Sequence, residues 1–570
     1  MAKKFKNYPL YETTVFEDFR IMVENVADKY PDKVAVSYKE DPNAKETSRV
    51  TYEQARQDIR KYGTALVDLG CREQKCAIIG TASIGWIYSY FSLMAIGAVT
   101  VPLDKEWPAE DLAATIERAE CKYLFYSAEV APKLDTIIEK NKKIKCVCMW
   151  GQGRKGDKTI DELIEKGEKL IAKGDASYFD YEIKRDEVAS IVFTSGTTGK
   201  GKGVMLSQTN IVTDMTQGMY NFAITPKTMC VLPLHHTFGS TVNLVGHYAQ
   251  GSEIYISSGL KYIQKELAEQ KPTHLILVPL FVETFYKKIW ANARSTGQEA
   301  KLKGAMKLSN SMLKVGIDMR KKLFKSIHDV FGGRCEMIIC GGAALNQDII
   351  DTFKAIGITI LNGYGITECA PLISCNRNKL QKDGSVGTPI IGELVKIDNP
   401  NDDGEGEICV KGPNVMLGYY KDEEATKAVF DDEGYFHTGD FGKVDEDGWL
   451  YITGRLKNLI ILSNGKNIYP EEIETEISRI PGVGEVVVYE GKSKSGKDAI
   501  VAEIYPDRDD LKSRKMEIDD LKQYFADEIK KVNARMAPYK AVGYIKVRDK
   551  EFMKNTSRKI TRFNIDRTIE

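Results

Sequence analysis

The chain has 570 residues, and its 81 basic Lys and Arg residues balance 81 acidic Asp and Glu residues, so the formal net charge is zero. Proteins that bind polyanions such as nucleic acid usually carry a basic excess, so this balance argues against that class. Apolar residues make up 42% of the chain and charged residues 28%. These values are typical of globular proteins and exclude a mostly disordered chain.

The chain shows no segment that would target it to a membrane or to the secretory pathway. Its first residues, MAKKFKNYPL, are basic but lack the apolar run of a secretory signal, and the apolar stretches 94–103 and 275–282 are too short to span a bilayer. Eleven scattered cysteines fit free thiols in a reducing compartment, and Cys146 and Cys148 have no second pair with which to hold zinc. We therefore expect a cytoplasmic protein; peripheral membrane contact and the oligomeric state stay open.

Strand-like and helix-like segments alternate through the first 365 residues. Short apolar runs typical of buried strands lie at 76–79, 123–126, 190–193, 230–234, 274–278, 337–340 and 358–361. Helical patterns lie between them, for example at 52–69, 109–119, 263–269 and 347–355. This alternation predicts an α/β fold of layered, largely parallel sheets.

The pattern changes after Gly384. Short β runs separated by Asp and Gly predict an antiparallel β module at 384–455, with a hairpin turn at 445–448. A third region alternates strands and helices as a compact α+β unit. We therefore predict a large N-terminal domain of residues 1–455 and a small C-terminal domain of residues 456–570.

A loop suited to phosphate follows the apolar run 190–193. Residues 194–204 (TSGTTGKGKGV) hold four glycines, four hydroxyl residues and two lysines. Glycines let backbone N–H groups approach a ligand, and hydroxyls and lysines add donors and charge, so the segment predicts a polyphosphate site. It comes close to a P-loop, but the position that should supply a magnesium-binding hydroxyl is Gly203, which disfavours a P-loop NTPase.

This loop resembles the signature of the adenylate-forming superfamily, which includes acyl-CoA synthetases, luciferases and peptide-synthetase adenylation domains. The usual T-S-G-T-T-G-x-P-K-G-V has its proline replaced here by Gly201, while Lys202 is kept. Further blocks follow in the family's order over nearly the whole chain: LPLHHTF at 232–238, GGAA at 341–344, NGYGITE at 362–368, YFHTGD at 435–440, GR at 454–455, SNGKNI at 463–468 and NTSRKITR at 555–562.

The resemblance implies a role for each of these blocks. The ATP- and AMP-binding residues would be Thr194, Ser195, Gly196, Thr197, Thr198, Gly199, Lys202, Gly341, Gly342, Ala343, Asn362, Gly363, Tyr364, Gly365, Thr367, Asp440, Arg455 and Lys559. The catalytic residues would be Lys559, Glu368, Lys202 and His236, with Glu368 also the magnesium ligand. Lys457 would be the hinge of a mobile C-terminal domain, and Gly465 and Lys466 would line the passage for CoA.

The function implied is ATP-dependent activation of a carboxylic acid to acyl-AMP, followed by transfer to a thiol. The blocks are most similar to bacterial long-chain fatty acyl-CoA synthetases, which implies a medium- or long-chain fatty acid, ATP, Mg²⁺ and CoA. An acyl-acyl carrier protein synthetase and an aryl-CoA ligase stay open, and a non-catalytic nucleotide-binding protein is a remote alternative. Segment 236–243 holds no carboxylate to pair with an amino acid's ammonium group, which disfavours a peptide-synthetase role.

Overall fold

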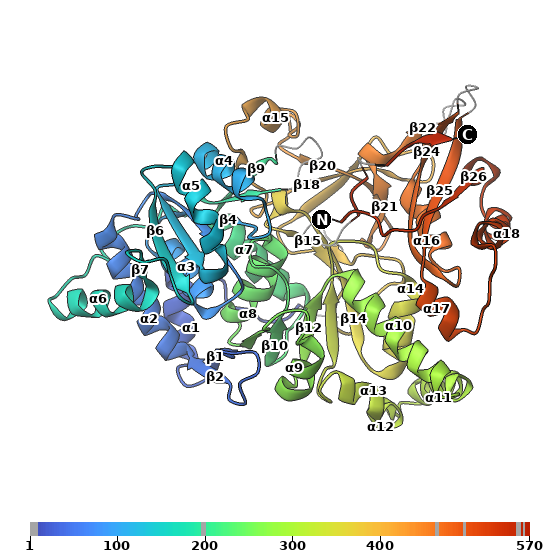
Figure 1. The fold of residues 1–570 in the computed structure, drawn as a ribbon, viewed down its shortest axis with the longest axis horizontal. Coiled ribbons are helices and arrows are strands. Elements are labelled where there is room, and N and C mark those ends of the chain that lie inside the picture. The colour runs from blue at the N-terminus through green and yellow to red at the C-terminus, as the bar shows by residue number, and fades with distance from the viewer. Residues whose placement is uncertain are drawn as a thin grey trace.

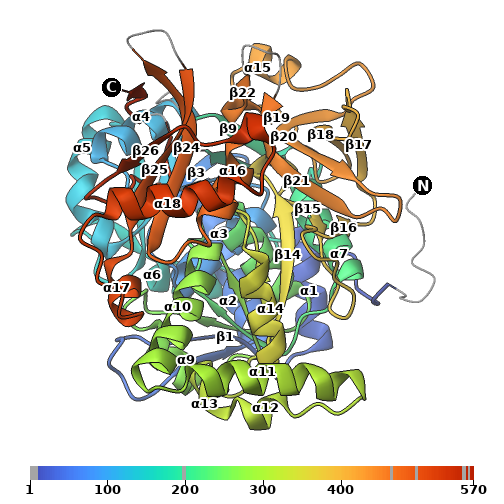
Figure 2. The same cartoon turned by 90° about the vertical axis from the view of Figure 1, so that its right-hand side faces the viewer.

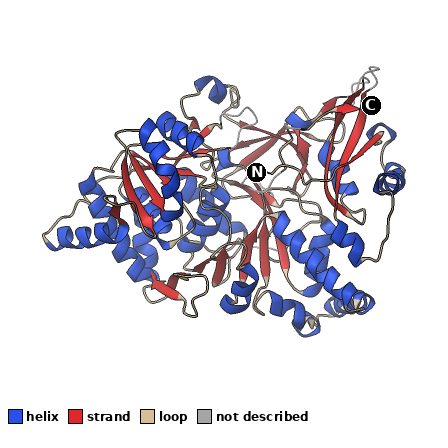
Figure 3. Ribbon diagram, viewed as in Figure 1, coloured by secondary structure: helices blue, strands red, loops and turns tan. Residues whose placement is uncertain are grey.

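The computed structural model describes residues 10–194, 201–461, 467–493, 498–554, 560–562 and 565–569. None of the helices in these segments combines the length and the apolar character that a membrane crossing requires. The eleven cysteines all lie in described segments, and none is joined in a disulfide. Helices and strands build a layered body with a smaller lobe at the C-terminal end (Figures 1 and 3).

The first large sheet has eight strands in the order β19-β9-β8-β4-β3-β5-β6-β7. Its strands are β3 (Lys75–Ile79), β4 (Val99–Leu103), β5 (Tyr123–Ser127), β6 (Lys145–Trp150), β7 (Lys158–Thr159), β8 (Val188–Phe193), β9 (Gly203–Ser207) and β19 (Gly418–Tyr419). The six strands β8, β4, β3, β5, β6 and β7 pair in parallel, each with the next in this order. At one edge, β9 pairs antiparallel with β8, and β19 pairs antiparallel with β9. The helices of this region are α1 (Phe19–Lys29), α2 (Tyr52–Leu69), α3 (Ile84–Ala95), α4 (Ala109–Ala119), η1 (Ala128–Lys133), α5 (Leu134–Lys140) and α6 (Ile160–Ala172).

The second large sheet has nine strands in the order β16-β15-β14-β13-β12-β10-β11-β1-β2. They are β1 (Val34–Tyr38), β2 (Ser48–Thr51), β10 (Lys227–Cys230), β11 (Glu253–Ile256), β12 (His274–Leu277), β13 (Met337–Cys340), β14 (Thr359–Gly365), β15 (Leu372–Cys375) and β16 (Thr388–Pro389). The accompanying helices are α7 (Gln208–Asn221), η2 (Phe238–Val245), α8 (Gly246–Ala249), α9 (Ile263–Gln270), α10 (Pro279–Ser295), α11 (Glu299–Lys314), α12 (Arg320–Leu323), α13 (Lys325–Val330), α14 (Gln347–Ile356) and η3 (Thr367–Cys369). The predicted class of layered, largely parallel α/β sheets is confirmed.

Two predicted strands differ clearly from the structure, whereas the limits of the others agree to within two residues. The run at 230–234 ends as a strand at Cys230, because Pro233 has no N–H to offer a sheet ladder. The run at 358–361 continues as far as Gly365, because β14 pairs with β15 beyond Leu361. Residues 362–365 of the 362–368 block therefore belong to β14. The block ends at Glu368, within the short helix η3.

The predicted antiparallel β module is a four-stranded sheet in the order β17-β18-β20-β21. Its strands are β17 (Leu394–Asp398), β18 (Gly406–Lys411), β20 (Phe436–Val444) and β21 (Leu450–Arg455), with helix α15 (Glu423–Lys427) between β18 and β20. The hairpin predicted at 445–448 joins β20 to β21. There the carboxylate of Asp445 accepts hydrogen bonds from the backbone N–H groups of Asp447 and Trp449, both at 3.0 Å, and so fixes the turn.

The C-terminal region forms its own lobe, drawn in orange-red and red in Figure 1. Its elements are η4 (Leu456–Asn458), β22 (Ile460–Ile461), β23 (Asn467–Ile468), α16 (Pro470–Ile477), β24 (Val483–Ser493), β25 (Asp498–Pro506), α17 (Arg508–Ser513), α18 (Leu521–Asn533), η5 (Pro538–Lys540), β26 (Tyr544–Val547) and β27 (Thr568–Ile569). A four-stranded sheet of order β26-β25-β24-β27 packs with α16 and α18 around an apolar core that includes Ile473, Ile477, Phe525 and Ile529. The boundary predicted after residue 455 falls between β21 and η4.

The lobe contacts the body through α10 and α17, which lie side by side in both views (Figures 1 and 2). The ammonium group of Lys287 pairs with Asp507 at 2.9 Å. The guanidinium group of Arg294 pairs with Asp510 at 2.9 Å and donates to the hydroxyl of Ser513 at 3.0 Å. Arg294 and Asp510 are largely buried, with side chains 9% and 14% exposed, so this pair is a built contact between the two parts.

Candidate functional site

The phosphate loop joins β8 to β9 at the edge of the first sheet. The backbone N–H of Thr194 donates to the carbonyl of Lys202 at 3.0 Å, which closes the base of the loop. The carbonyl of Gly201, the residue that replaces the usual proline, accepts from the guanidinium of Arg118 at 2.8 Å. Ser195, Gly196, Thr197, Thr198 and Gly199 lie outside the described residues.

Lys202 stands beside a tyrosine from a distant part of the chain. β19 pairs with β9, which places Tyr419 opposite Val204. The ammonium group of Lys202 lies 4.3 Å from the centre of the Tyr419 ring, a distance at which the ring face attracts a cation. The Tyr419 hydroxyl donates to the Oε1 atom of Glu368 at 3.0 Å. Thus Tyr419 contacts two predicted catalytic residues at once.

Tyr364, Asp440 and Arg455 form a second group of predicted site residues. The antiparallel pairing of β20 with β21 sets Asp440 opposite Arg455, and their side chains make an ion pair at 2.7 Å. The Tyr364 hydroxyl donates to the other Asp440 oxygen at 2.8 Å. Asp440 is only 2% exposed, so both of these bonds form away from bulk water. Burial, followed by the charge of Asp440, raises the pKa of Tyr364 well above its usual value, so the phenol keeps its proton and acts as a donor.

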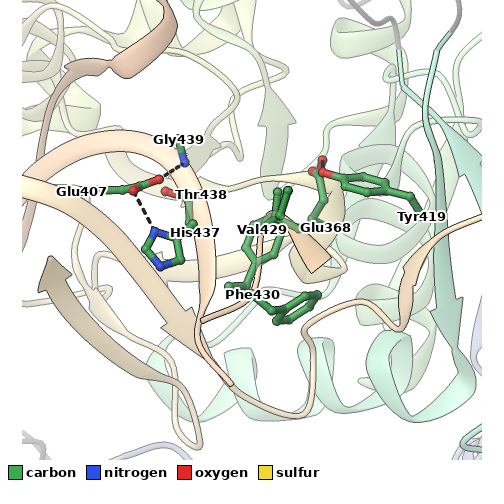
Figure 4. Close-up of a pocket in the computed structure, with 10 residues that line it drawn as sticks. Glu368, Glu407, Tyr419, Val429, Phe430, His437, Thr438 and Gly439 are labelled. Atoms are coloured by element: carbon green, nitrogen blue, oxygen red, sulfur yellow. Dashed lines mark hydrogen bonds and ion pairs between the residues drawn. The ribbon is translucent and has the colours of Figure 1, made fainter. Parts of the chain in front are cut away.

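A cavity of about 410 Å³ opens beside these groups. Its lining residues are Glu368, Glu407, Tyr419, Ala428, Val429, Phe430, Phe436, His437, Thr438 and Gly439. Figure 4 shows Glu368 and Tyr419 on one side of the cavity and Glu407 with His437 on the other. The volume falls within the range of small-molecule sites, and the lining combines apolar side chains with a few polar groups.

The block 435–440 forms one wall of this cavity. The His437 ring contacts Glu407 at 2.8 Å, and the second oxygen of Glu407 accepts from the backbone N–H of Gly439 at 3.0 Å (Figure 4). The Thr438 hydroxyl donates to the carbonyl of Ile408 at 2.7 Å and accepts from the Asp440 N–H at 3.1 Å. Gly439 has a φ of +70°, a conformation that favours glycine. These contacts fix the turn that presents Asp440.

The paired histidines lie in the loop between β10 and η2. Their ring centres are 4.2 Å apart, and His235 Nε2 lies 3.6 Å from Asp104 Oδ2. Burial, followed by the positive charge of Lys105, lowers the pKa of His235 to about 4, so His235 is neutral at pH 7. The carbonyl of His236 accepts the first N–H groups of η2, from Gly239 and Ser240. A catalytic role for His236 stays a prediction.

The small residues after β13 lie close to the 362–368 block. A Cβ atom on Gly341 would lie 3.3 Å from the carbonyl of Gly363, so this position favours glycine. Gly342, with a φ of +91°, and Ala343 are exposed. Asn362 ends the parallel part of β14, while Gly365 and Thr367 lead into η3. Gly341 thus lies against Gly363, the residue before Tyr364, and Gly342 and Ala343 continue from it at the surface.

The structure also places the predicted hinge. Lys457 lies in η4, the short helix that begins directly after Arg455. Gly465, Lys466 and Lys559 lie outside the described residues. Close to Lys559 in sequence, Arg562 pairs with Glu474 at 2.6 Å and donates to the carbonyl of Val488 at 3.1 Å, which ties the chain end to the lobe.

Several residues that line the cavity carried no prediction. Tyr419, Glu407 and Phe430 belong to segments whose sequence shows no motif of reactive groups, and His437 was noted only as part of its block. For Tyr419 the missing information is the pairing of β19 with β9, which joins residues more than 200 positions apart. A tyrosine beside a glycine in a short apolar run gives no local sign of such pairing.

The sequence matches the family described as AMP-binding enzyme over residues 23–420. A long-chain-fatty-acid–CoA ligase of Mycobacterium bovis is 28% identical over 458 residues, covering 77% of this chain and 75% of that protein. A chloroplastic long-chain-fatty-acid–[acyl-carrier-protein] ligase of Arabidopsis thaliana is also 28% identical, over 549 residues, covering 83% and 75%. The fold is similar to that of o-succinylbenzoate coenzyme A synthetase of Bacillus subtilis in complex with ATP and magnesium, with a TM-score of 0.69, 21% identity and coverage of 95% and 98%.

The matched family covers more than half of the chain, including β8, β9, the 362–368 block and Tyr419. The chain therefore belongs to the family of AMP-binding enzymes, and the predicted resemblance to the adenylate-forming superfamily is confirmed.

Proposed function

We propose that this enzyme activates a long-chain or medium-chain fatty acid with ATP and transfers the acyl group to the thiol of CoA. The observation that carries the proposal is a cavity lined by Glu368 and Tyr419, with Lys202 over the Tyr419 ring and the Tyr364–Asp440–Arg455 group directly after the lining residue Gly439. Relatives named as long-chain fatty acid ligases, each covered over about three quarters of its length, support the choice of substrate.

The reaction needs two steps because a carboxylate is a poor electrophile. In the first step a carboxylate oxygen of the acid attacks the α-phosphorus of ATP, the bond from that phosphorus to the bridging oxygen breaks, and pyrophosphate leaves. In the second, the CoA thiol gives up its proton and attacks the acyl carbon, and AMP leaves. The protein's task in such transfers is to position the groups and to stabilise the developing charge.

Glu368 is suited to hold the magnesium ion that accompanies ATP. Its carboxylate lines the cavity and supplies the hard oxygen that Mg²⁺ prefers, while the Tyr419 hydroxyl fixes its orientation. Mg²⁺ would neutralise phosphate charge when bound. Lys202, held over the Tyr419 ring at the end of the phosphate loop, would bring a second positive charge to the same phosphates.

The Tyr364–Asp440–Arg455 group is suited to the nucleoside. Asp440 is held from both sides, so its remaining lone pairs can accept the two ribose hydroxyls in a fixed position. The face of Tyr364 and the small residues 341–343 offer a flat surface for adenine.

The second step is assigned to the C-terminal domain. We propose that residues 456–570 turn about Lys457, so that Lys559 serves adenylation and the segment with Gly465 and Lys466 then admits the pantetheine arm. Two sets of residues on one moving domain let a single site perform both reactions in turn.

The test is AMP release from purified enzyme with ATP, Mg²⁺ and a panel of fatty and aryl acids. The proposal expects release that depends on both the acid and CoA and is fastest with a fatty acid of medium or long chain. Release that peaks with an aryl acid would contradict the substrate class. AMP release that does not require the acid or CoA would contradict the proposed ligase activity. Absence of AMP release with every acid in the panel would contradict it as well.

Transfer to acyl carrier protein is the second candidate, because a relative of similar identity carries that activity in its name. The same assay therefore includes holo-acyl carrier protein as a competing acceptor. If the acyl group is transferred to the carrier protein in preference to CoA, the carrier protein is the acceptor in the second step. The proposed adenylation step then stays unchanged.

A further inference from the structure

A group of three metal-ligating side chains borders the cavity on the side away from Glu368. Glu407 and Cys409 lie on β18, two positions apart, and His437 lies opposite Cys409 on β20. Residues two apart on a strand point to the same face, and directly opposed residues on paired strands are close neighbours. The sheet register itself therefore brings a carboxylate, a thiol and an imidazole together.

The distances within the group suit one cation. His437 Nδ1 lies 3.4 Å from Cys409 Sγ and 2.8 Å from Glu407 Oε2, and the three ligand atoms all lie within 4.8 Å of one another. Tetrahedral zinc with bonds of about 2.0–2.3 Å separates neighbouring ligand atoms by roughly 3.3–3.8 Å. The Cys409–His437 distance already has this value, and the Glu407–His437 distance needs to open by only about half an ångström.

Each ligand is oriented by its surroundings. The other oxygen of Glu407 accepts from the Gly439 N–H at 3.0 Å, and Cys409 is fully buried. On the far side of the His437 ring, Nε2 lies 3.9 Å from the carboxylate of Asp431, which is itself paired with Lys396 at 2.5 Å. A carboxylate behind a metal-binding histidine is a common outer partner that raises the ligand's basicity.

We propose that Glu407, Cys409 and His437 bind a divalent cation of the zinc class. Cys409 binds as the thiolate and gives up its proton to solvent, so that the thiolate and the Glu407 carboxylate together balance the two positive charges. A sulfur ligand selects Zn²⁺ or Co²⁺ over Mg²⁺ and Ca²⁺, which prefer oxygen. Glu407 and His437 are 20% and 26% exposed towards the cavity, which leaves a fourth coordination position open on that side.

This site is independent of the magnesium site proposed at Glu368. The two differ in donor chemistry, and in the described part of the chain Glu368 makes no hydrogen bond or ion pair with any of the three ligands. Metal binding here requires no catalysis, so it can be tested whether or not the enzyme turns over a fatty acid.

The first experiment adds Co²⁺ to reduced full-length protein from which the reductant has been removed. A cobalt–thiolate bond gives a charge-transfer band in the near ultraviolet, and we expect this band at one equivalent of Co²⁺, displaced by Zn²⁺ but not by excess Mg²⁺. Cys409→Ser should abolish the band. Cys146→Ser is the matched control, because Cys146 is the least buried of the eleven thiols, and it should leave the band unchanged.

The second experiment measures zinc affinity by competition with a chromophoric chelator. His437→Gln and Glu407→Gln should each weaken Zn²⁺ binding by at least about tenfold, whereas Glu368→Gln should not. The apo proteins' Tm values establish whether each variant is folded, and Zn²⁺ should raise the Tm of the wild type and of Glu368→Gln more than that of the His437 and Glu407 variants. If Cys409→Ser does not fold, the His437 variant carries the test.

The proposal is overturned if the wild type gives no cobalt–thiolate band, or if the band survives in folded Cys409→Ser. It is also overturned if Zn²⁺ affinity falls in Glu368→Gln but is unchanged in His437→Gln, because the cation would then occupy the Glu368 side of the cavity.

Discussion

Asp440 accepts a hydrogen bond from the Tyr364 hydroxyl and forms an ion pair with Arg455. Asp440 is buried, so both interactions are shielded from bulk water. A carboxylate held in this way is a preorganised acceptor for ribose hydroxyls. We predict that Asp440→Asn weakens ATP binding about 10- to 100-fold, since hydrogen bonds to a charged group contribute roughly 1.5–3 kcal/mol.

The measurement for this prediction is calorimetric binding of ATP and 2′-deoxy-ATP to both proteins. The wild type should prefer ATP, and Asp440→Asn should lose most of that preference, since the hydroxyl and its acceptor act as a pair. Asp432→Asn, an exposed acid in the same β module, should behave as the wild type. Equal preference for ATP in wild type and Asp440→Asn would mean that Asp440 does not contact the ribose.

A second buried acid, Glu393, gives a prediction about pH. It is 7% exposed, and neither of its carboxylate oxygens has a hydrogen-bond partner among the described residues. Burial raises the pKa of Glu393 from about 4.5 to about 8. Between these values the unfolded chain loses a proton that the folded chain keeps. Deprotonation therefore favours unfolding, and this group lowers stability as pH rises from about 4.5 to 8.

We predict that Glu393→Gln removes this loss, because the amide stays neutral and can donate to Asn414, whose side chain lies beside position 393 and whose Oδ1 atom has no hydrogen-bond partner among the described residues. The Tm of Glu393→Gln should be close to that of the wild type at pH 5 and higher than it at pH 8. The free energy of unfolding should be larger in the variant at pH 8 by about 1 kcal/mol or more. Thermal unfolding at both pH values measures it, with the exposed Glu423→Gln as control. A Tm difference that does not change with pH would contradict the prediction.

At the scale of the elements, the contact between α10 and α17 is one place where the lobe meets the body. Arg294 and Asp510 form its most buried ion pair, and a glutamate at position 294 would place a second carboxylate beside Asp510, with Arg514 left as the cation that pairs with it. We predict that Arg294→Glu frees α17, so that backbone amides of 508–513 exchange hydrogen about tenfold faster or more.

Hydrogen–deuterium exchange followed by mass spectrometry measures this change. Lys303→Glu is a suitable control, because it reverses a charge on the neighbouring helix α11 in an exposed i,i+4 pair with Glu299. Unchanged exchange in α17 of Arg294→Glu would show that apolar packing, and not this ion pair, holds the lobe in place.

The elements also show what sequence patterns can predict. The helix at 52–69 was predicted to its exact limits because Thr51 and Gln54 form a capping box at its start and Gly70 adopts the left-handed conformation at its end. The prediction of a strand at 230–234 was wrong. The run is apolar, but Pro233 cannot donate a backbone hydrogen bond to a sheet, and β10 ends at Cys230. The motifs named Tyr364, Asp440 and Arg455, which the structure joins by a hydrogen bond and an ion pair, and their roles in binding stay predictions. Tyr419 and the Glu407–Cys409–His437 group were not predictable, because strand pairing over long separations creates them.

At the scale of the whole molecule, the proposed function divides the two reaction steps between two faces of the C-terminal domain. We predict that Lys559→Ala loses most ATP–pyrophosphate exchange but still converts a supplied acyl-adenylate and CoA to the thioester, because the lysine stabilises charge only at the α-phosphate.

The two half-reactions are measured separately, with Lys550→Ala as a control for the removal of an exposed lysine from the same domain. Equal losses in the two assays would contradict the division of labour. If Lys559→Ala loses thioester formation but keeps ATP–pyrophosphate exchange, Lys559 acts in the second step and not in adenylation.

The strand order of the two large sheets also determines when the protein can complete its fold during synthesis. Val36 in β1 pairs with Ile254 in β11, and Val204 in β9 pairs with Tyr419 in β19. At a translation rate of roughly 5–20 residues per second, the edge strand β9 leaves the ribosome about 10–40 s before its outer partner is made. An unpaired strand edge is a template for pairing with other chains. Chains that terminate before residue 418 therefore keep this edge open permanently, and we expect them to aggregate rather than to accumulate as a folded body.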